Sequence, residues 1–307
     1  MKPILLIGNT GQLGQELQQI LIPLGNKLAP EKVIALGRSQ IDLTQSESLR
    51  QLIAQIQPQV IINAAAYTAV DKAESESELA TAVNATAPAI LAEVAQKLGA
   101  FLIHVSTDYV FDGSQSHPYR ETDKTNPLGI YGQTKLAGES AIRQNCAQHL
   151  IIRTAWVYGS YGKSNFVKTM LRLGGEREEI RVVADQIGSP TWARDLALAI
   201  AHILPQLTPE IAGTYHYTNS GVASWYDFAQ AIFEEAEAIE FPLKIQRLIP
   251  ITTADYPTPA QCPAYSVLAC EKISKVLGTE RPHWRLALRQ MLAEYTLNYE
   301  STNSFRR

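Results

Sequence analysis

The chain has 307 residues, of which 46% are hydrophobic and 19% are charged, and its formal net charge is −3. These values are ordinary for a globular protein, and the length suits one large domain or two unequal ones. The balanced charge argues against a nucleic-acid partner and against a membrane-surface role, because both usually need concentrated basic charge.

The first part of the chain predicts strands and helices in regular alternation. Apolar runs that read as buried strands lie at 3–9, 32–38, 59–66 and 100–107. Between them, "TQSE" predicts a helix with Thr44 as its N-cap, and a stripe of apolar residues before Gly99 predicts another helix. This alternation predicts the α/β class: a doubly wound, Rossmann-like parallel sheet with helices on both faces.

A fifth strand is predicted at 149–159, and the order loosens after it. Shorter strands are expected within 177–191 and 213–221, and helices at 224–238 and 283–295. We therefore expect a dinucleotide-binding domain over residues 1–159. A smaller α/β domain over 160–307 would mainly bind substrate, with some later segments returning to the first sheet.

The segment after the first strand, "GNTGQLG", has the spacing G-x-x-G-x-x-G. In parallel sheets, ligands bind beyond the carboxyl ends of the strands, and glycines there permit a tight turn and close approach to a pyrophosphate at a helix N-terminus. The pattern alone also fits a purely structural turn. The candidate cofactor-binding residues are Gly8, Thr10, Gly11, Gln12, Leu13 and Gly14.

The next two strand ends carry further candidates for cofactor binding. The second strand ends in Arg38 and Ser39 instead of the acid typical of NAD sites, which favours a 2′-phosphate, although Arg38 also fits a solvated loop. Asp42 and Leu43 follow where an adenine edge could bind. After the third strand, small residues would let the chain pass close to a flat cofactor, but they are equally normal in a core: Ala64, Ala65 and Ala66, followed by Tyr67.

Polar residues also end the fourth predicted strand, where Thr107, Asp108 and Tyr109 must bind a neighbour or a ligand. Further on, Tyr131 and Lys135 are four positions apart, so a helix would place them on one face. Such a pair is either an exposed helical contact or a phenol made acidic by a cation for proton transfer.

Together these residues resemble the extended short-chain dehydrogenase/reductase family. The resemblance rests on the glycine turn, the Asn-Ala-Ala run, the hydroxyl residue after the fourth strand and Tyr-x-x-x-Lys. The motifs "RTAWVYG", "DQIGSPT", "SWYDFA" and "YPTPA" extend it over nearly the whole chain. The resemblance implies a dTDP-sugar substrate and hydride transfer from NADPH, or from NADH, to the C4 ketone of dTDP-4-dehydro-L-rhamnose.

The same resemblance implies a role for each matching residue. Tyr131 would donate a proton to the carbonyl oxygen, and Thr107 would bind that oxygen. Lys135 would bind the nicotinamide ribose and lower the Tyr131 pKa. Substrate-binding residues would be Thr107, Asp108, Tyr109 and Trp156, although Trp156 also fits a core aromatic.

The sequence departs from the family pattern at Cys262, where an arginine suited to the nucleotide diphosphate is usual. Either Arg194 or Lys163 replaces that cation, or substrate binding is altered. The resemblance also implies a homodimer and, in some relatives, Mg²⁺ at the dimer contact. The sequence shows no compact carboxylate cluster that demands Mg²⁺, so no metal ligand is assigned.

Two alternative functions stay open. An epimerase or dehydratase could use the same scaffold, although a dehydratase of this family would need an Asp-Glu pair where the chain has Asp108 and Tyr109. The second alternative is a non-catalytic regulatory subunit, of the kind that serves methionine adenosyltransferase.

The cysteines and the N-terminus predict a cytoplasmic location. Cys146, Cys262 and Cys270 form neither a zinc pattern nor a disulfide framework, and no signal peptide is evident.

Overall fold

The computed structural model describes residues 2–28 and 33–304. Its strands are β1 (Ile4–Ile7), β2 (Val33–Leu36), β3 (Val60–Asn63), β4 (Phe101–Thr107), β5 (His149–Thr154), β6 (Val157–Tyr158), β7 (Glu179–Val183), β8 (Ile187–Gly188), β9 (Thr191–Trp192), β10 (Gly213–His216), β11 (Ala223–Ser224) and β12 (Arg247–Ile251). Its α-helices are α1 (Gln12–Leu28), α2 (Ser46–Ile56), α3 (Val70–Ala73), α4 (Ser77–Thr81), α5 (Ala87–Leu98), α6 (Ile130–Asn145), α7 (Phe166–Glu176), α8 (Ala193–Ile203), α9 (Trp225–Glu237), α10 (Glu271–Leu277) and α11 (Trp284–Ser304).

The main sheet has the strand order β10-β5-β4-β3-β1-β2, and all neighbouring strands in it are parallel. The predicted doubly wound α/β fold is therefore confirmed. The order reverses between β1 and β3, the position at which such sheets bind ligands. Although β10 comes late in the chain, it joins this sheet beside β5.

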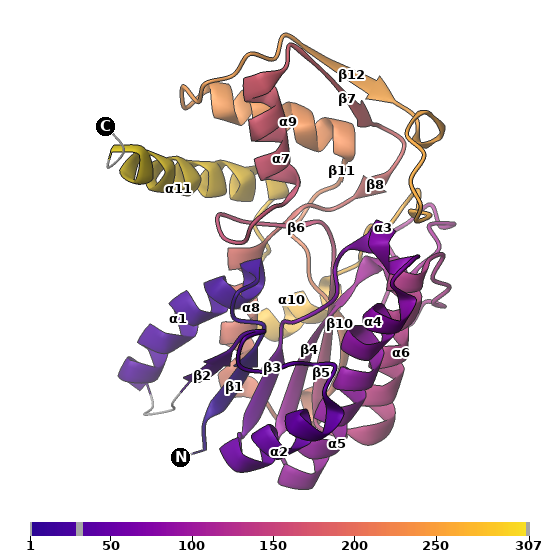
Figure 1. The fold of residues 1–307 in the computed structure, drawn as a ribbon, viewed down its shortest axis with the longest axis vertical. Coiled ribbons are helices and arrows are strands. Elements are labelled where there is room, and N and C mark those ends of the chain that lie inside the picture. The colour runs from indigo at the N-terminus through magenta and orange to yellow at the C-terminus, as the bar shows by residue number, and fades with distance from the viewer. Residues whose placement is uncertain (1, 29–32, 305–307) are drawn as a thin grey trace.

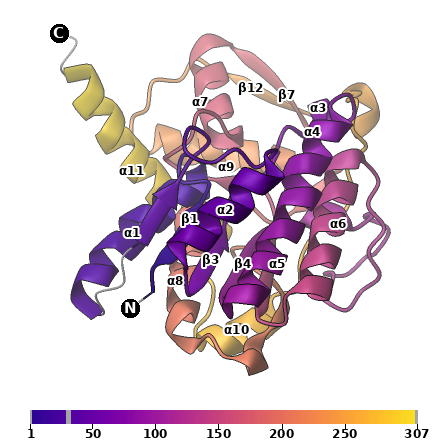
Figure 2. The same cartoon turned by 60° about the horizontal axis from the view of Figure 1, so that its bottom comes forward.

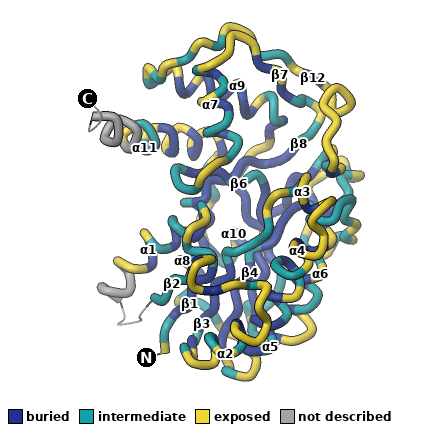
Figure 3. Tube along the Cα trace, viewed as in Figure 1, coloured by how far each residue is buried: buried dark blue, intermediate teal, exposed yellow. Residues whose placement is uncertain are grey.

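Helices cover both faces of this sheet because its strands are apolar on both sides (Figures 1 and 2). Leu17 of α1 and Ile200 of α8 pack on one face. Ile53 of α2, Leu91 of α5 and Ile142 of α6 pack on the other. The buried strands stand between the more exposed helices and loops in Figure 3. The sheet is thereby fixed as a rigid platform whose strand ends can carry a site.

A second hydrophobic core lies above the carboxyl ends of the main strands (Figure 1). Met170 of α7, Phe228 of α9 and Leu288 of α11 are buried in it. The parallel pair β7–β12 lies against α9. The division of the chain into two domains at residue 159 stays a prediction.

Two local predictions were wrong. The predicted strand 149–159 is interrupted after Thr154, and β6 pairs with β9 instead of joining the main sheet. Thr44 does not cap α2, which begins at Ser46, because its hydroxyl donates to the Asp42 carboxylate. No helix in the described part of the chain combines the length and apolar character needed to cross a membrane.

Candidate active site

The turn between β1 and α1 needs two of its three glycines for packing. Gly8 has φ +93°, and a Cβ added there would lie 2.7 Å from the Ala65 nitrogen. A Cβ on Gly14 would lie 2.0 Å from the Gly8 carbonyl oxygen. The turn is therefore pressed against the end of β3 on one side and against its own helix on the other.

Gly11 is different because none of the residues that the structure describes crowds it. A Cβ there would meet only the Gly8 carbonyl oxygen, at 3.5 Å, and Gly11 is exposed. The first turn of α1 carries no acidic side chain, so its free N–H groups suit an anion. Together these features leave open space at the N-terminus of α1 that would suit a pyrophosphate.

The other residues of the turn have separate positions. Thr10 is exposed, whereas the Leu13 side chain is buried in the core, so only its backbone is available to a ligand. The Gln12 side chain donates to the Val157 carbonyl and accepts a hydrogen bond from Asn165 at 2.7 Å. Gln12 thus ties the glycine turn to the segment that follows β5.

Arg38 and Ser39 are exposed beyond the end of β2. Within residues 2–28 and 33–304, no ion pair involves Arg38, so its guanidinium is available to a ligand phosphate. Asp42 accepts hydrogen bonds from the Thr44 backbone and side chain, which lower its pKa, with a smaller contribution from Arg38. Leu43 packs against the core beneath α2.

The segment after β3 packs beside Gly8 and is hydrogen-bonded to Asn84. Ala64 and Ala65 are half-buried beside Gly8, and Ala66 is half-buried as well. The buried side chain of Asn84 accepts from the Tyr67 N–H at 2.9 Å and donates to the Tyr67 carbonyl at 3.0 Å. The same amide lies 3.3 Å from the Thr134 hydroxyl on α6, so one residue links this segment to that helix.

Thr107 and Asp108 are both buried where β4 ends. The Thr107 hydroxyl donates to Asp108 Oδ1 at 3.1 Å and accepts from the Tyr109 N–H at 3.2 Å. Burial raises the pKa of Asp108 to about 6, although hydrogen bonds from Ser266 and Thr107 act in the opposite direction. The neighbouring Thr154 hydroxyl is buried and has no partner among the described residues.

Tyr131 lies in the first turn of α6, which begins against the end of β4. The Glu74 carboxylate accepts from the Ile130 N–H at 2.8 Å and so caps this helix from a distant segment. The Tyr109 and Tyr131 rings meet edge to face with centroids 5.5 Å apart. Burial raises the pKa of Tyr131 to about 12, and a hydrogen bond from Thr107 opposes that rise.

Lys135 is buried one turn further along α6. Its Nζ donates to the Val105 carbonyl at 2.6 Å and lies 3.3 Å from His104 Nε2. Burial lowers the pKa of Lys135 to about 8. Burial dominates the Tyr131 pKa in this structure, so the lowering of that pKa by Lys135 stays a prediction.

Trp156 lies between β5 and β6, where the predicted strand 149–159 is broken. Its φ of +48° is unusual for a residue with a large side chain. Its ring is half-buried and stacks on Trp225, with centroids 3.5 Å apart. A Cβ on Gly188 would lie 2.6 Å from that ring, so a glycine is needed there. Such strain in a non-glycine residue motivates a functional hypothesis for Trp156.

Cys262 contacts the same cluster, because the Tyr109 hydroxyl donates to its thiol at 3.5 Å. Burial raises the pKa of this thiol. Arg194 is already engaged by Glu16 at 2.9 Å and Glu294 at 2.7 Å. Lys163 is exposed and follows Gly162, which packs against the Gln12 side chain. Two cations were considered as substitutes for the arginine that is usual at position 262. Of these, Arg194 is already paired with Glu16 and Glu294.

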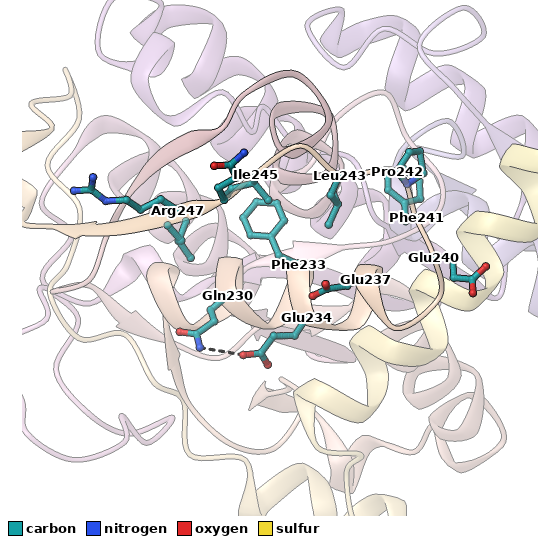
Figure 4. Close-up of a pocket in the computed structure, with 12 residues that line it drawn as sticks. Gln230, Phe233, Glu234, Glu237, Glu240, Phe241, Pro242, Leu243, Ile245 and Arg247 are labelled. Carbon is teal, nitrogen blue, oxygen red and sulfur yellow. Dashed lines mark hydrogen bonds between the residues drawn. The ribbon is translucent and has the colours of Figure 1, made fainter.

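Two other features lie outside this cluster. The described residues contain no group of three or more His, Cys, Asp or Glu side chains placed to bind a metal ion, so the structure gives no support for Mg²⁺. A cavity of about 520 Å³ lies between α9 and the segment before β12 (Figure 4). Its lining includes Phe233, Glu234 and Leu243 but none of the candidate site residues.

Sequence reasoning missed two residues that support the site, Asn84 and His104, and used Asn63 only as part of the Asn-Ala-Ala run. His104 interrupts the apolar run "FLIHVST", so it could have been noticed as a polar residue at a buried strand position. Asn84 lies in a π-helical turn between α4 and α5, and no pattern in the sequence predicts its two hydrogen bonds to Tyr67.

Comparison with known proteins decides the family. The model of the RmlD substrate binding domain family matches residues 1–297. The dTDP-4-dehydrorhamnose reductase of Escherichia coli strain K12 is 47% identical over 293 residues, covering 95% of this chain and 97% of that protein. The chain belongs to the RmlD family.

Solved structures agree with this assignment. A dTDP-4-dehydrorhamnose reductase from Clostridium acetobutylicum has a TM-score of 0.87 at 37% identity, covering 96% of this chain and 99% of that one. The Bacillus anthracis dTDP-4-dehydrorhamnose reductase, solved in complex with NADP, has a TM-score of 0.85 at 38% identity, with 95% and 99% covered. The prediction that this RmlD-family chain is an oxidoreductase is confirmed.

Proposed function

We propose that the chain reduces the C4 ketone of dTDP-4-dehydro-L-rhamnose with NADPH, giving dTDP-L-rhamnose. The observation that carries the proposal is the convergence of Thr107, Tyr131 and Lys135 where β4 ends against α6. Relatives that match nearly the whole chain are named for this reaction.

The glycine turn fits a dinucleotide. Gly11 leaves open space above the N-terminus of α1, and Arg38 is an exposed cation beyond β2 suited to a 2′-phosphate. The Bacillus anthracis relative was solved with NADP. When bound, NADPH would supply the hydride, held by the glycine turn, by Arg38 and Ser39, and by the segment Ala64–Tyr67.

The side chains at the end of β4 would handle the proton. Because burial raises the Tyr131 pKa to about 12, the phenol keeps its proton at neutral pH and can donate it to the carbonyl oxygen. The Thr107 hydroxyl, which lies where β4 ends, would position the same oxygen. The Lys135 ammonium would bind the ribose hydroxyls of the cofactor and add positive charge.

The sugar nucleotide would lie between the end of β4 and the second hydrophobic core. Asp108 and Tyr109 extend from β4, and Trp156 offers a ring whose other face is fixed by Trp225. In this proposal residues 1–159 bind the cofactor and residues 160–307 mainly bind the sugar nucleotide. Cys262 would leave the diphosphate with one cation fewer than the family pattern provides.

Turnover tests the proposal directly. Purified protein is mixed with NADPH and dTDP-4-dehydro-L-rhamnose, and the loss of NADPH absorbance is followed together with the appearance of dTDP-L-rhamnose. Oxidation of one NADPH per product is expected, and Thr107→Ala should reduce it strongly. NADPH binding without oxidation would support the regulatory-subunit alternative, and sugar conversion without net NADPH oxidation would support an epimerase.

A further inference from the structure

The Gln12 side chain joins the first turn of α1 to the segment that runs from β6 to α7. Its Oε1 accepts a hydrogen bond from Asn165 Nδ2 at 2.7 Å, and its Nε2 donates to the Val157 carbonyl at 3.4 Å. Val157 and Asn165 are the chain neighbours of Tyr158 and Phe166, which pack in the second hydrophobic core. Both polar ends of Gln12 are therefore engaged by residues beside that core.

The orientation of both side-chain amides follows from one backbone group. The Lys168 N–H can only donate, so Asn165 Oδ1 is the acceptor that caps α7, at 3.0 Å. Asn165 Nδ2 then uses its two hydrogens on Gln12 Oε1 at 2.7 Å and on the Gly159 carbonyl at 2.9 Å. Because Gln12 Oε1 is an acceptor, its Nε2 faces Val157. Asn165 thus caps one helix and binds the first residue of another.

The segment of residues 159–165 also packs directly on Gln12. Gly162 has φ +78°, and a Cβ there would lie 2.6 Å from Gln12 Cγ and 3.6 Å from the Gln12 backbone nitrogen. From α7, Lys168 Nζ donates to the Gly162 carbonyl at 2.8 Å and to the Tyr161 carbonyl at 3.3 Å. The segment is therefore held between α7 and the start of α1.

The same contacts reach Trp156. A φ of +48° in a residue with a large side chain persists only where its neighbours hold it. Its ring stacks on Trp225, and its carbonyl accepts from the Thr191 N–H at 3.2 Å. The next carbonyl along the chain, that of Val157, is the one that accepts from Gln12. The position of Gln12 and the position of the Trp156 ring are therefore linked.

We propose that Gln12 and Asn165 are positioning residues that couple pyrophosphate binding at the N-terminus of α1 to the placement of Trp156. This inference rests on the proposed function, in which a cofactor binds at α1 and Trp156 lines the sugar site. The Gln12 backbone N–H belongs to the first turn of α1, which would hold the pyrophosphate. A bound pyrophosphate would fix Gln12, and Gln12 would fix Trp156. Two ligands that favour the same arrangement bind with positive coupling.

Two variants break this connection without removing the pyrophosphate site. Asn165→Ser keeps a good N-cap for α7, but the shorter side chain cannot reach Gln12. Gln12→Met keeps the side-chain length and the backbone N–H but loses both side-chain hydrogen bonds. Gln18→Met is the matched control, because Gln18 is a glutamine on α1 whose Nε2 donates to the Asn9 carbonyl at 2.8 Å and the Gly14 carbonyl at 3.3 Å. Those two bonds stay within the glycine turn.

The probe is ADP-ribose, which carries the pyrophosphate but has no nicotinamide ring that could touch Trp156. Its binding is measured by calorimetry, and the readout is the indole ¹H–¹⁵N signal of Trp156, assigned by its loss in Trp156→Phe. Saturating ADP-ribose should shift this signal in the wild type and in Gln18→Met. Asn165→Ser and Gln12→Met should still bind ADP-ribose but lose most of the shift. A wild type that does not bind ADP-ribose, a wild-type signal that does not respond, or a full response in both site variants would overturn the proposal.

The affinity for dTDP-L-rhamnose, with and without NADPH, measures the coupling a second way. This sugar nucleotide has no ketone, so it forms a complex with NADPH that does not react. NADPH should tighten its binding about fivefold in the wild type and little in Asn165→Ser, and adding Gln12→Met should cause no further loss. A coupled Trp156 signal in a protein that does not reduce dTDP-4-dehydro-L-rhamnose would reject the proposed function alone.

Discussion

At the scale of single residues, burial sets the chemistry of the end of β4. Asp108 and Lys135 are buried and Tyr131 is half-buried, and in each case burial favours the uncharged form. The pKa values are about 6, 12 and 8. Tyr131 therefore holds its proton throughout the neutral range, whereas Asp108 and Lys135 change charge close to it.

Asp108 should carry a stability penalty that depends on pH. Its raised pKa means that the ionised carboxylate is disfavoured in the folded state, so the penalty is full above pH 6 and absent below about pH 4. A rise from 3.8 to about 6 corresponds to at most about 3 kcal/mol. Asp108→Asn should therefore increase the free energy of unfolding by about 1–3 kcal/mol at pH 8 and little at pH 4, as measured by urea denaturation.

Asp112 provides the control of opposite sign for this prediction. Its pKa is lowered by hydrogen bonds, first from Asn126 and then from Ser114, so its ionised form stabilises the fold at neutral pH. Asp112→Asn should be destabilising at pH 8, and the difference should shrink in acid. Stabilisation by Asp108→Asn that is equal at pH 4 and pH 8 would contradict the burial argument.

Arg38 should select between the two nicotinamide cofactors. An exposed guanidinium without an ion pair in the described ranges can bind a 2′-phosphate, which NADH lacks. Arg38→Ala should raise the KM for NADPH about tenfold, the loss of one charge-assisted contact, and leave the KM for NADH nearly unchanged. Steady-state kinetics with both cofactors measure this, and equal effects would remove the 2′-phosphate role.

At the scale of elements, different glycines of the turn between β1 and α1 serve packing and ligand binding. Gly14→Ala would drive a Cβ to 2.0 Å from the Gly8 carbonyl oxygen and should lower the free energy of unfolding by about 2 kcal/mol or more. Gly11→Ala has room in the protein, so its stability should hold while NADPH binding weakens. Thermal unfolding and fluorescence titration are the measurements, and equal destabilisation by both variants would refute the distinction.

The elements also show where sequence reasoning succeeds. The apolar strands and the helix that ends before Gly99, which has φ +66°, follow from periodicity and local chemistry. The cap at Thr44 failed because Asp42 offered its hydroxyl a nearer acceptor. The break at Trp156 depends on contacts with Gly188 and Trp225, which are distant in sequence, so no local pattern could predict it.

At the scale of the whole molecule, the sequence predicts the position of the segments after residue 159 only in general terms. The sequence left open which of them return to the first sheet, and the register of β10 beside β5 supplies the answer. The motifs singled out Thr107, Tyr131 and Lys135, which the structure places at the end of β4 and at the start of α6; their roles stay a prediction. The contacts of His104 with Asn63 and with Lys135 escaped prediction because they join three separate elements.

Arg194 links the main sheet to the second core. It bonds Glu16 of α1 and Glu294 of α11, and Glu16 is fully buried. Arg194→Met should leave Glu16 charged and unpaired, lowering the free energy of unfolding by roughly 2–4 kcal/mol. The double variant Glu16→Gln/Arg194→Met should recover part of that loss in urea denaturation. If the double variant is no more stable than the single one, the pair does not act as a unit.

The central claim is that Tyr131 donates the proton during ketone reduction. The direct measurement compares kcat for dTDP-4-dehydro-L-rhamnose in the wild type and Tyr131→Phe, with NADPH affinity determined by fluorescence in parallel. Losing a positioned acid should lower kcat by roughly 10²–10⁴ while the NADPH Kd stays within about twofold. In the wild type, kcat should fall as pH rises through about 8, where Lys135 loses its proton. A Tyr131→Phe enzyme with near-normal kcat would contradict the account.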